Sequence, residues 1–164
     1  TVGSGNFLHG IALSSSKLFT AGSVPFIDDD GLTVTASGGF SNYLIPKIID
    51  HLLGSAAFTF DTSVFLALYT TNPTAADSGT EASGGGYARL AIDFNTASGG
   101  SASNTDLEDF GTASANIGTI SHFGIRDNSP GGNLHVFGAW NTALAVNSGD
   151  TYRVPAGNLT VALD

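Results

Sequence analysis

The amino-acid sequence predicts a mainly β fold: a two-sheet antiparallel sandwich, jelly-roll-like, with one short helix and an N-terminal arm. From Val64 onward, short apolar or alternating segments are separated by turns rich in Gly, Asn and Pro, which predicts about seven or eight short strands. The 22 glycines show no three-residue period, so they suit tight turns and not a collagen-like structure. Two sheets enclosing one core are the expected arrangement.

The helix is predicted over residues 42–54. Ser41 or Asn42 can cap its start, Gly54 suits its end, and Pro46 is compatible only with the first turn. Apolar residues recur there in one stripe of the kind that normally packs on a core. These residues are Leu44, Ile45, Ile48, Ile49, Leu52 and Leu53.

The strands are clearest in three places. Residues 64–70 are apolar on both alternating faces, as in a buried strand, and residues 87–94 alternate as in a half-buried strand. Residues 117–127 and 133–140 are separated by NSPGG, the strongest hairpin signal in the chain. Residues 95–106 are polar enough to predict an exposed loop, and the acids of 106–109 are expected on the surface. The order of the strands cannot be deduced from these patterns.

Two regions are predicted, an arm over residues 1–31 and the sandwich domain over residues 32–164. The arm is irregular and interrupted by Gly, Ser and Pro, but it is too apolar for a free, solvated tail. It is expected to contact another subunit or a partner protein, although it could instead complete the core of its own domain. The candidate contact residues are Phe7, Leu8, Ile11, Leu13, Leu18, Phe19, Val24, Phe26 and Ile27.

Charge and composition exclude several classes of partner. Five basic residues face 14 acidic ones, and the net charge of −9 argues against binding to nucleic acid or to an anionic membrane. The absence of cysteine excludes disulfides, thiolate catalysis and sulfur metal sites. No signal peptide and no apolar run near the length of a membrane helix are visible, which predicts a protein made in the cytoplasm.

No pattern predicts catalysis, so we expect a protein that is not an enzyme and that has no cofactor or metal. Nucleophile elbows, phosphate-binding loops and paired metal-ligand histidines are all missing from the sequence. One arrangement has two interpretations. A hairpin across NSPGG places His122 and His135 on one face of the sheet, where they could hold a metal or act as a pH switch. Because no third ligand is evident, two ordinary strand histidines are the preferred interpretation.

Three segments carry a more specific resemblance. They are FLALYTTNPTAADSGTEASGGGYAR (65–89), GTISHFGIRDNSPGGNLHVFGA (118–139) and NSGDTYRVPAGNLTVAL (147–163). With the preceding helix, this order resembles a family of tailed-bacteriophage virion proteins with the pattern LxLYTxxP…GTExSGGxYxR. Members of that family are described as tail-fibre, minor structural or head decoration proteins. The resemblance covers residues 42–164 and leaves residues 1–41 unmatched.

The matched residues are expected to have architectural roles, as turn or loop anchors. Glu81 and Arg89 are expected to pair across the loop between them, and as an exposed pair they would contribute at most about 1 kcal/mol. Asp127 and Asp150 can accept hydrogen bonds from backbone amides in their turns. The full set of anchors is Pro73, Glu81, Gly86, Arg89, Asp127, Gly132 and Asp150.

The resemblance implies a protein of the virion, made in the host cytoplasm, and two roles are considered. The favoured role is a capsid decoration (cement) protein, a homotrimer that binds the major capsid protein on the outer surface of the head and stabilises contacts between capsomers. The alternative is a tail-fibre or receptor-binding component that recognises host surface glycan. Its binding surface would be formed by loops 71–86 and 95–106 with Tyr69, Tyr87 and Trp140. Against it, the chain lacks a coiled-coil or repetitive shaft.

Overall fold

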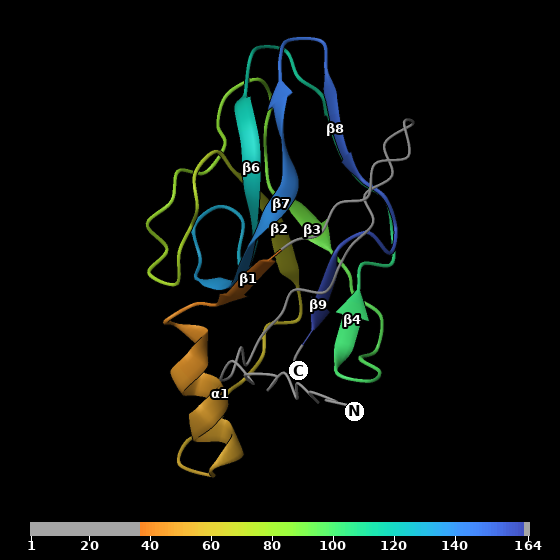
Figure 1. The fold of residues 1–164 in the computed structure, drawn as a ribbon. Helices are drawn as coiled ribbons and strands as arrows, with labels where there is room; N and C mark the ends of the chain where they lie inside the picture. The colour runs from red at the N-terminus through yellow and green to blue at the C-terminus, as the bar shows by residue number, and fades with distance from the viewer. Residues whose placement is uncertain (1–36, 163–164) are drawn as a thin grey trace, which may run out of the picture.

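The computed structural model describes residues 37–162 (Figure 1). The arm predicted over residues 1–31, with all of its candidate contact residues, lies outside the described residues. The described part is mainly β with one helix, as the sequence predicts. Its elements are β1 (Ser37–Phe40), α1 (Leu44–Leu52), β2 (Val64–Tyr69), β3 (Leu90–Ile92), β4 (Ser101–Ser103), β5 (Glu108–Thr112), β6 (Gly118–Arg126), β7 (Leu134–Val146), β8 (Thr151–Val154) and β9 (Thr160–Ala162).

The strands form three antiparallel sheets. The largest has five strands in the order β1-β7-β6-β2-β3, and β4 pairs with β9 while β5 pairs with β8. At its centre is the hairpin predicted across NSPGG, in which Phe123 lies opposite Gly138 and the Asp127 amide donates to the Asn133 carbonyl at 3.2 Å. The predicted mainly β antiparallel fold is therefore confirmed.

The core lies between the five-stranded sheet and the β5–β8 pair. Phe123 contacts Trp140, Trp140 contacts Tyr152 of β8, and Tyr152 meets Phe110 of β5 edge to face. This chain of aromatic rings connects the two layers, and aliphatic side chains of β2, β6 and β7 fill the space around it. The layers are those of a sandwich.

The expected loop 95–106 and the expected acidic surface at 106–109 are both partly wrong. Residues Ser101–Ser103 form β4, because they pair with β9, although their small polar side chains give no strand signal. Glu108 opens β5 and is 6% exposed. β4 and Glu108 both owe their positions to pairing between strands that are distant in the sequence. Local residue patterns do not predict such pairing.

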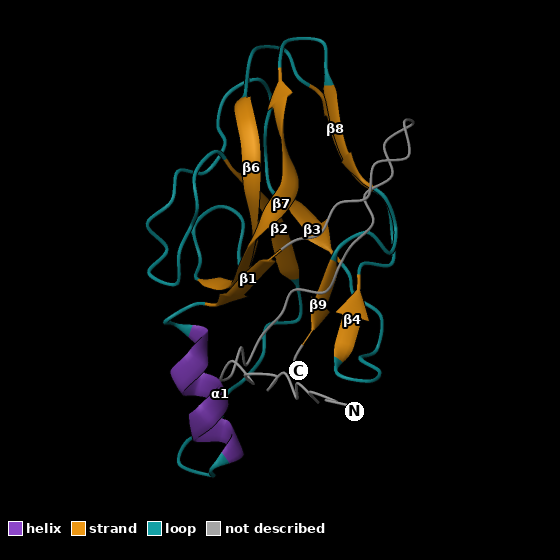
Figure 2. Ribbon diagram, viewed as in Figure 1, coloured by secondary structure: helices purple, strands orange, loops and turns teal. Residues whose placement is uncertain are grey.

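α1 forms where the periodicity predicts it. The Ser41 hydroxyl accepts a hydrogen bond from the Leu44 amide at 3.1 Å, and Gly54 follows the helix with a φ of 71°. However, only Leu44 of the apolar stripe is buried, because the helix extends away from the strands (Figure 2). The exposed members are Ile45, Ile49, Leu52 and Leu53. No helix among residues 37–162 is long and apolar enough to cross a membrane.

Candidate binding site

The loop after β2, residues 70–80, is held in one conformation by its own hydrogen bonds. Pro73 is buried and its carbonyl accepts from the Ser78 amide at 2.7 Å. The Asn72 side chain accepts from the Thr74 amide at 2.9 Å, an Asx turn. The Thr71 hydroxyl accepts from the Thr80 amide at 2.7 Å. The loop is thus a built structure, with Pro73 as the turn anchor that the sequence indicates.

Two residues of this loop have strained backbones. Thr74 and Asp77 have φ values of 59° and 54°, in the left-handed region that a β-branched residue such as Thr rarely adopts. Each such residue costs on the order of 1–3 kcal/mol, and such strain gathers at binding and catalytic sites. The surrounding contacts must therefore hold the loop against this cost.

Arg126 supplies the main restraint. Arg126 is 7% exposed, and its guanidinium forms a two-pronged ion pair with the Asp77 carboxylate, at 2.8 and 2.7 Å. It also donates to the Tyr69 hydroxyl at 2.6 Å and to the Gly132 carbonyl at 2.7 Å. One side chain of β6 therefore joins the strained loop to β2 and to the β6–β7 turn. A charged residue inside an apolar strand is the only sequence signal of this role.

A second arginine anchors the other side of the same turn. Arg89 donates to both carboxylate oxygens of Glu81, at 2.7 and 2.6 Å, to the Asn128 carbonyl at 2.7 Å and to the Gly131 carbonyl. Its side chain is 10% exposed and that of Glu81 is 26% exposed. The expected pair is present, but it is largely buried, so removing one of its partners should cost more than the estimate for an exposed pair.

Tyr87 belongs to this second network. Its hydroxyl donates to Glu81 at 3.0 Å and accepts from the Leu68 amide at 2.9 Å, and burial raises its pKa. Tyr69 is 1% exposed and Trp140 is 6% exposed, so both lie in the interior. The suggestion that Tyr69 and Trp140 contribute to a glycan-binding surface is therefore wrong, because their strands are central in the main sheet.

The remaining anchors occupy turns. The Asp127 carboxylate accepts from the Asn133 amide at 2.6 Å, and the Asp150 carboxylate accepts from the Asn147 amide at 2.8 Å. Gly132 has a φ of 73°, and a Cβ there would lie 2.2 Å from the Asp127 Oδ1 atom. Gly86 also has a positive φ, 84°, where the chain approaches β3.

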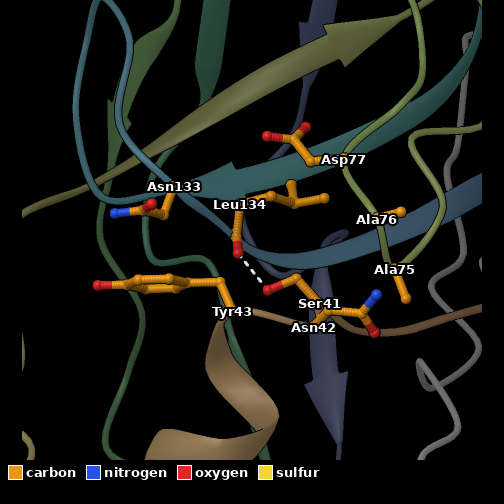
Figure 3. A pocket seen from close by; sticks show the side chains of 8 residues that line it. All are labelled: Ser41, Asn42, Tyr43, Ala75, Ala76, Asp77, Asn133 and Leu134. Atoms are coloured by element: carbon orange, nitrogen blue, oxygen red, sulfur yellow. Dashed lines mark hydrogen bonds between the residues drawn. The ribbon is translucent and has the colours of Figure 1, made fainter.

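Two cavities lie on either side of the β6–β7 turn. The first, about 290 Å³, lies between the start of α1 and the strained loop (Figure 3). Tyr43 and Asn133 lie on one side of it, with Ala75 and Ala76 on the other. Its lining is Ser41, Asn42, Tyr43, Ala75, Ala76, Asp77, Asn133 and Leu134. The second, about 370 Å³, is lined by Glu81, Tyr87, Ala88, Arg89, Ser129 and Pro130.

The first cavity has the chemistry of a small polar ligand site. Asn42, Asn133 and Asp77 offer amide and carboxylate groups, and Tyr43 offers an aromatic ring. Its volume is at the lower end for ligand sites, which fits a single ring-sized group. Its walls come from three separate segments. Arg126 joins Asp77 to the β6–β7 turn, and the backbone amides of Ser41 and Asn42 donate to the carbonyls of His135 and Ala75 at 2.9 and 2.8 Å.

The two histidines of the hairpin do not form a pair. His122 lies opposite Ala139 and Tyr69, and its Nδ1 atom is 2.8 Å from the Ser121 hydroxyl. His135 lies at the turn end of β7. Burial lowers the pKa of both histidines. The arrangement considered from sequence, with both imidazoles on one ion, is therefore absent.

α1 and the segment after it present a different kind of surface. Leu52 and Leu53 are each 75% exposed and Phe60, in the following segment, is 60% exposed. The Lys47 ammonium lies 4.8 Å from the centre of the Tyr43 ring, a cation–π distance. α1 therefore begins at the polar cavity and ends in an exposed apolar surface.

Comparison with known protein families identifies the family of this chain. The family described as "Podophage GP4 fiber I protein gp80" matches residues 39–162. Because this match covers most of the chain, the chain belongs to that family. It is therefore a structural protein of a tailed-phage virion. None of the curated proteins matches it.

Proposed function

We propose that this chain is a fibre component of the virion that recognises a glycan on the host surface. The observation that carries the proposal is the strained loop at Thr74 and Asp77, which Arg126 holds rigidly against a polar cavity. Preorganised walls reduce the ordering cost of binding, which a weak, shallow sugar site needs. The fibre description of the family supports this role over head decoration.

The ligand site in this proposal is the cavity of Figure 3 and not the surface first suggested by the sequence. Amide and carboxylate groups of Asn42, Asn133 and Asp77 would form hydrogen bonds with sugar hydroxyls, beside the Tyr43 ring. We infer a binding role and not a catalytic one, because the Asp77 carboxylate is committed to Arg126.

A blocking substitution tests the site. Ala76 is exposed and lines the cavity, so Ala76→Trp fills the space without removing a buried contact. Labelled full-length protein should bind host cells, purified surface polysaccharide should compete, and Ala76→Trp should weaken binding at least about tenfold. Ala143→Trp, at an exposed position of β7, is the matched control and should bind as the unsubstituted protein does.

Head decoration makes the opposite prediction. A cement protein would bind expanded, undecorated capsids through the major capsid protein and would not bind host cells. Capsid binding without cell binding would therefore overturn the fibre proposal and restore the decoration role.

Assembly of copies is a second part of the proposal. The apolar stripe of α1 is exposed at Ile45, Ile49, Leu52 and Leu53, so the stripes of three copies can pack together around a threefold axis. The expected homotrimer would use this contact. Sedimentation should show that Leu52→Asp lowers the oligomeric state while Ser55→Asp, an exposed polar control, does not; an unchanged state in Leu52→Asp would contradict the contact.

A further inference from the structure

Three ligand-bearing side chains from separate segments meet beside the β6–β7 turn. The carboxylates of Asp61 and Asp127 and an imidazole nitrogen of His135 all lie within 4.8 Å of one another. Asp61 lies between α1 and β2, Asp127 follows β6 and His135 belongs to β7. The fold, and no sequence motif, brings them together.

The position of His135 depends on an irregularity in the hairpin. Ile125 lies opposite Val136, but Arg126 lies opposite Leu134, so His135 is the extra residue of a β-bulge. Bulges redirect side chains and occur next to functional sites. The His135 ring stacks on Tyr43 with an interplanar angle of 3°, which fixes its orientation.

One nitrogen of the buried His135 imidazole has no hydrogen-bond partner within residues 37–162. His135 is 7% exposed, and its Nε2 atom has no hydrogen-bond partner among the described residues. The closest carboxylate oxygen, Oδ2 of Asp127, is 3.8 Å away, too far for a hydrogen bond. A buried polar atom without a partner is destabilising. Here it points into a group of two carboxylates.

A metal ion would account for this geometry. Two atoms that bind one ion at about 2.1 Å stand about 3.4 Å apart in a tetrahedral site, close to the His135–Asp127 separation. Asp61 is exposed and can move the remaining distance. Asn133 donates to the Asp127 carboxylate at 2.6 and 2.7 Å, as outer partners of metal ligands do.

We propose that Asp61, Asp127 and His135 form a binding site for a divalent transition-metal ion, with zinc the best fit. An imidazole with two carboxylates suits zinc or manganese and disfavours calcium and magnesium. Two carboxylates balance the charge of the ion, and water fills the open positions. The ion would fasten the segment after α1 to the hairpin, whether or not the chain binds a glycan.

Calorimetric titration of the full chain with zinc chloride tests the site. One ion per chain should bind, and saturating zinc should raise the melting temperature by about 5 °C or more. Asp61→Asn removes an exposed ligand without touching the core and should weaken zinc binding at least about tenfold. Asp50→Asn, an exposed acid of α1 outside the cluster, should bind zinc within about twofold of the unsubstituted chain.

NMR of the imidazole nitrogens locates the ion. Zinc should shift the His135 signals and leave those of His51 and His122 in place, and manganese should bind more tightly than calcium or magnesium. The proposal is overturned if zinc does not bind, if Asp61→Asn binds it as tightly as the unsubstituted chain, or if another histidine responds instead.

Discussion

The clearest test of the loop anchors is removal of the Arg89 guanidinium by Arg89→Met. The substitution deletes two charge-assisted hydrogen bonds to Glu81 and two bonds to carbonyls of the β6–β7 turn. Removing one partner of a buried ion pair costs about 3–5 kcal/mol. Because Glu81 keeps some solvent contact and its hydrogen bond from Tyr87, we expect Arg89→Met to lower the free energy of unfolding by about 3 kcal/mol.

Urea unfolding followed by the fluorescence of Trp140 measures this loss. Trp140 is the single tryptophan of the chain and is 6% exposed, so its emission reports the core. With a urea dependence of about 2 kcal/mol per molar, Arg89→Met should lower the midpoint by about 1.5 M.

Arg153→Met is the matched control. Arg153 pairs with Asp109 at a similar distance, 2.8 Å, but the two side chains are 58% and 37% exposed. Water screens that pair, so its loss should leave the midpoint almost unchanged. Equal losses in the two variants would refute the reasoning, since burial would then not decide the contribution of either pair.

Three other predictions follow from particular contacts. Burial raises the pKa of Glu108, so stability linked to its protonation is present below about pH 4 and lost as pH rises through the folded-state value. Glu108→Gln should therefore raise the melting temperature at pH 7 and leave it unchanged below pH 4; no gain at pH 7 would contradict this. Gly131→Ala should destabilise the fold by about 1–2 kcal/mol, from its positive φ alone. Gly132→Ala should destabilise it more, because a Cβ at Gly132 would collide with Asp127 and one at Gly131 would meet no neighbour. Equal urea midpoints for the two variants would contradict the close approach of Gly132 to Asp127. Deleting residues 1–31 should weaken assembly or partner binding. Unchanged assembly and binding would contradict a contact role for the arm.

The features predictable from sequence are those with a local cause. NSPGG specifies the hairpin because its Gly residues adopt positive φ, and the 3.6-residue period specifies α1. The Glu81–Arg89 pair was predictable because the two residues bracket one loop, although its burial was not. Sequence spacing says nothing about which strands cover a side chain.

The features that could not be predicted from the sequence depend on contacts between residues far apart in the chain. β4 exists because β9 pairs with it, and the stripe of α1 stays exposed because the helix extends away from the sheet. Arg126 joins Tyr69, Asp77 and Gly132 across the fold. Such contacts depend on strand order, which no residue pattern in the chain determines.

The central claim, that this virion protein is a fibre component, is tested most directly by its position in the particle. Electron micrographs of virions labelled with antibody against the chain would give that position. We expect label on fibres at the tail. Label spread over the surface of the head, with none at the tail, would contradict it.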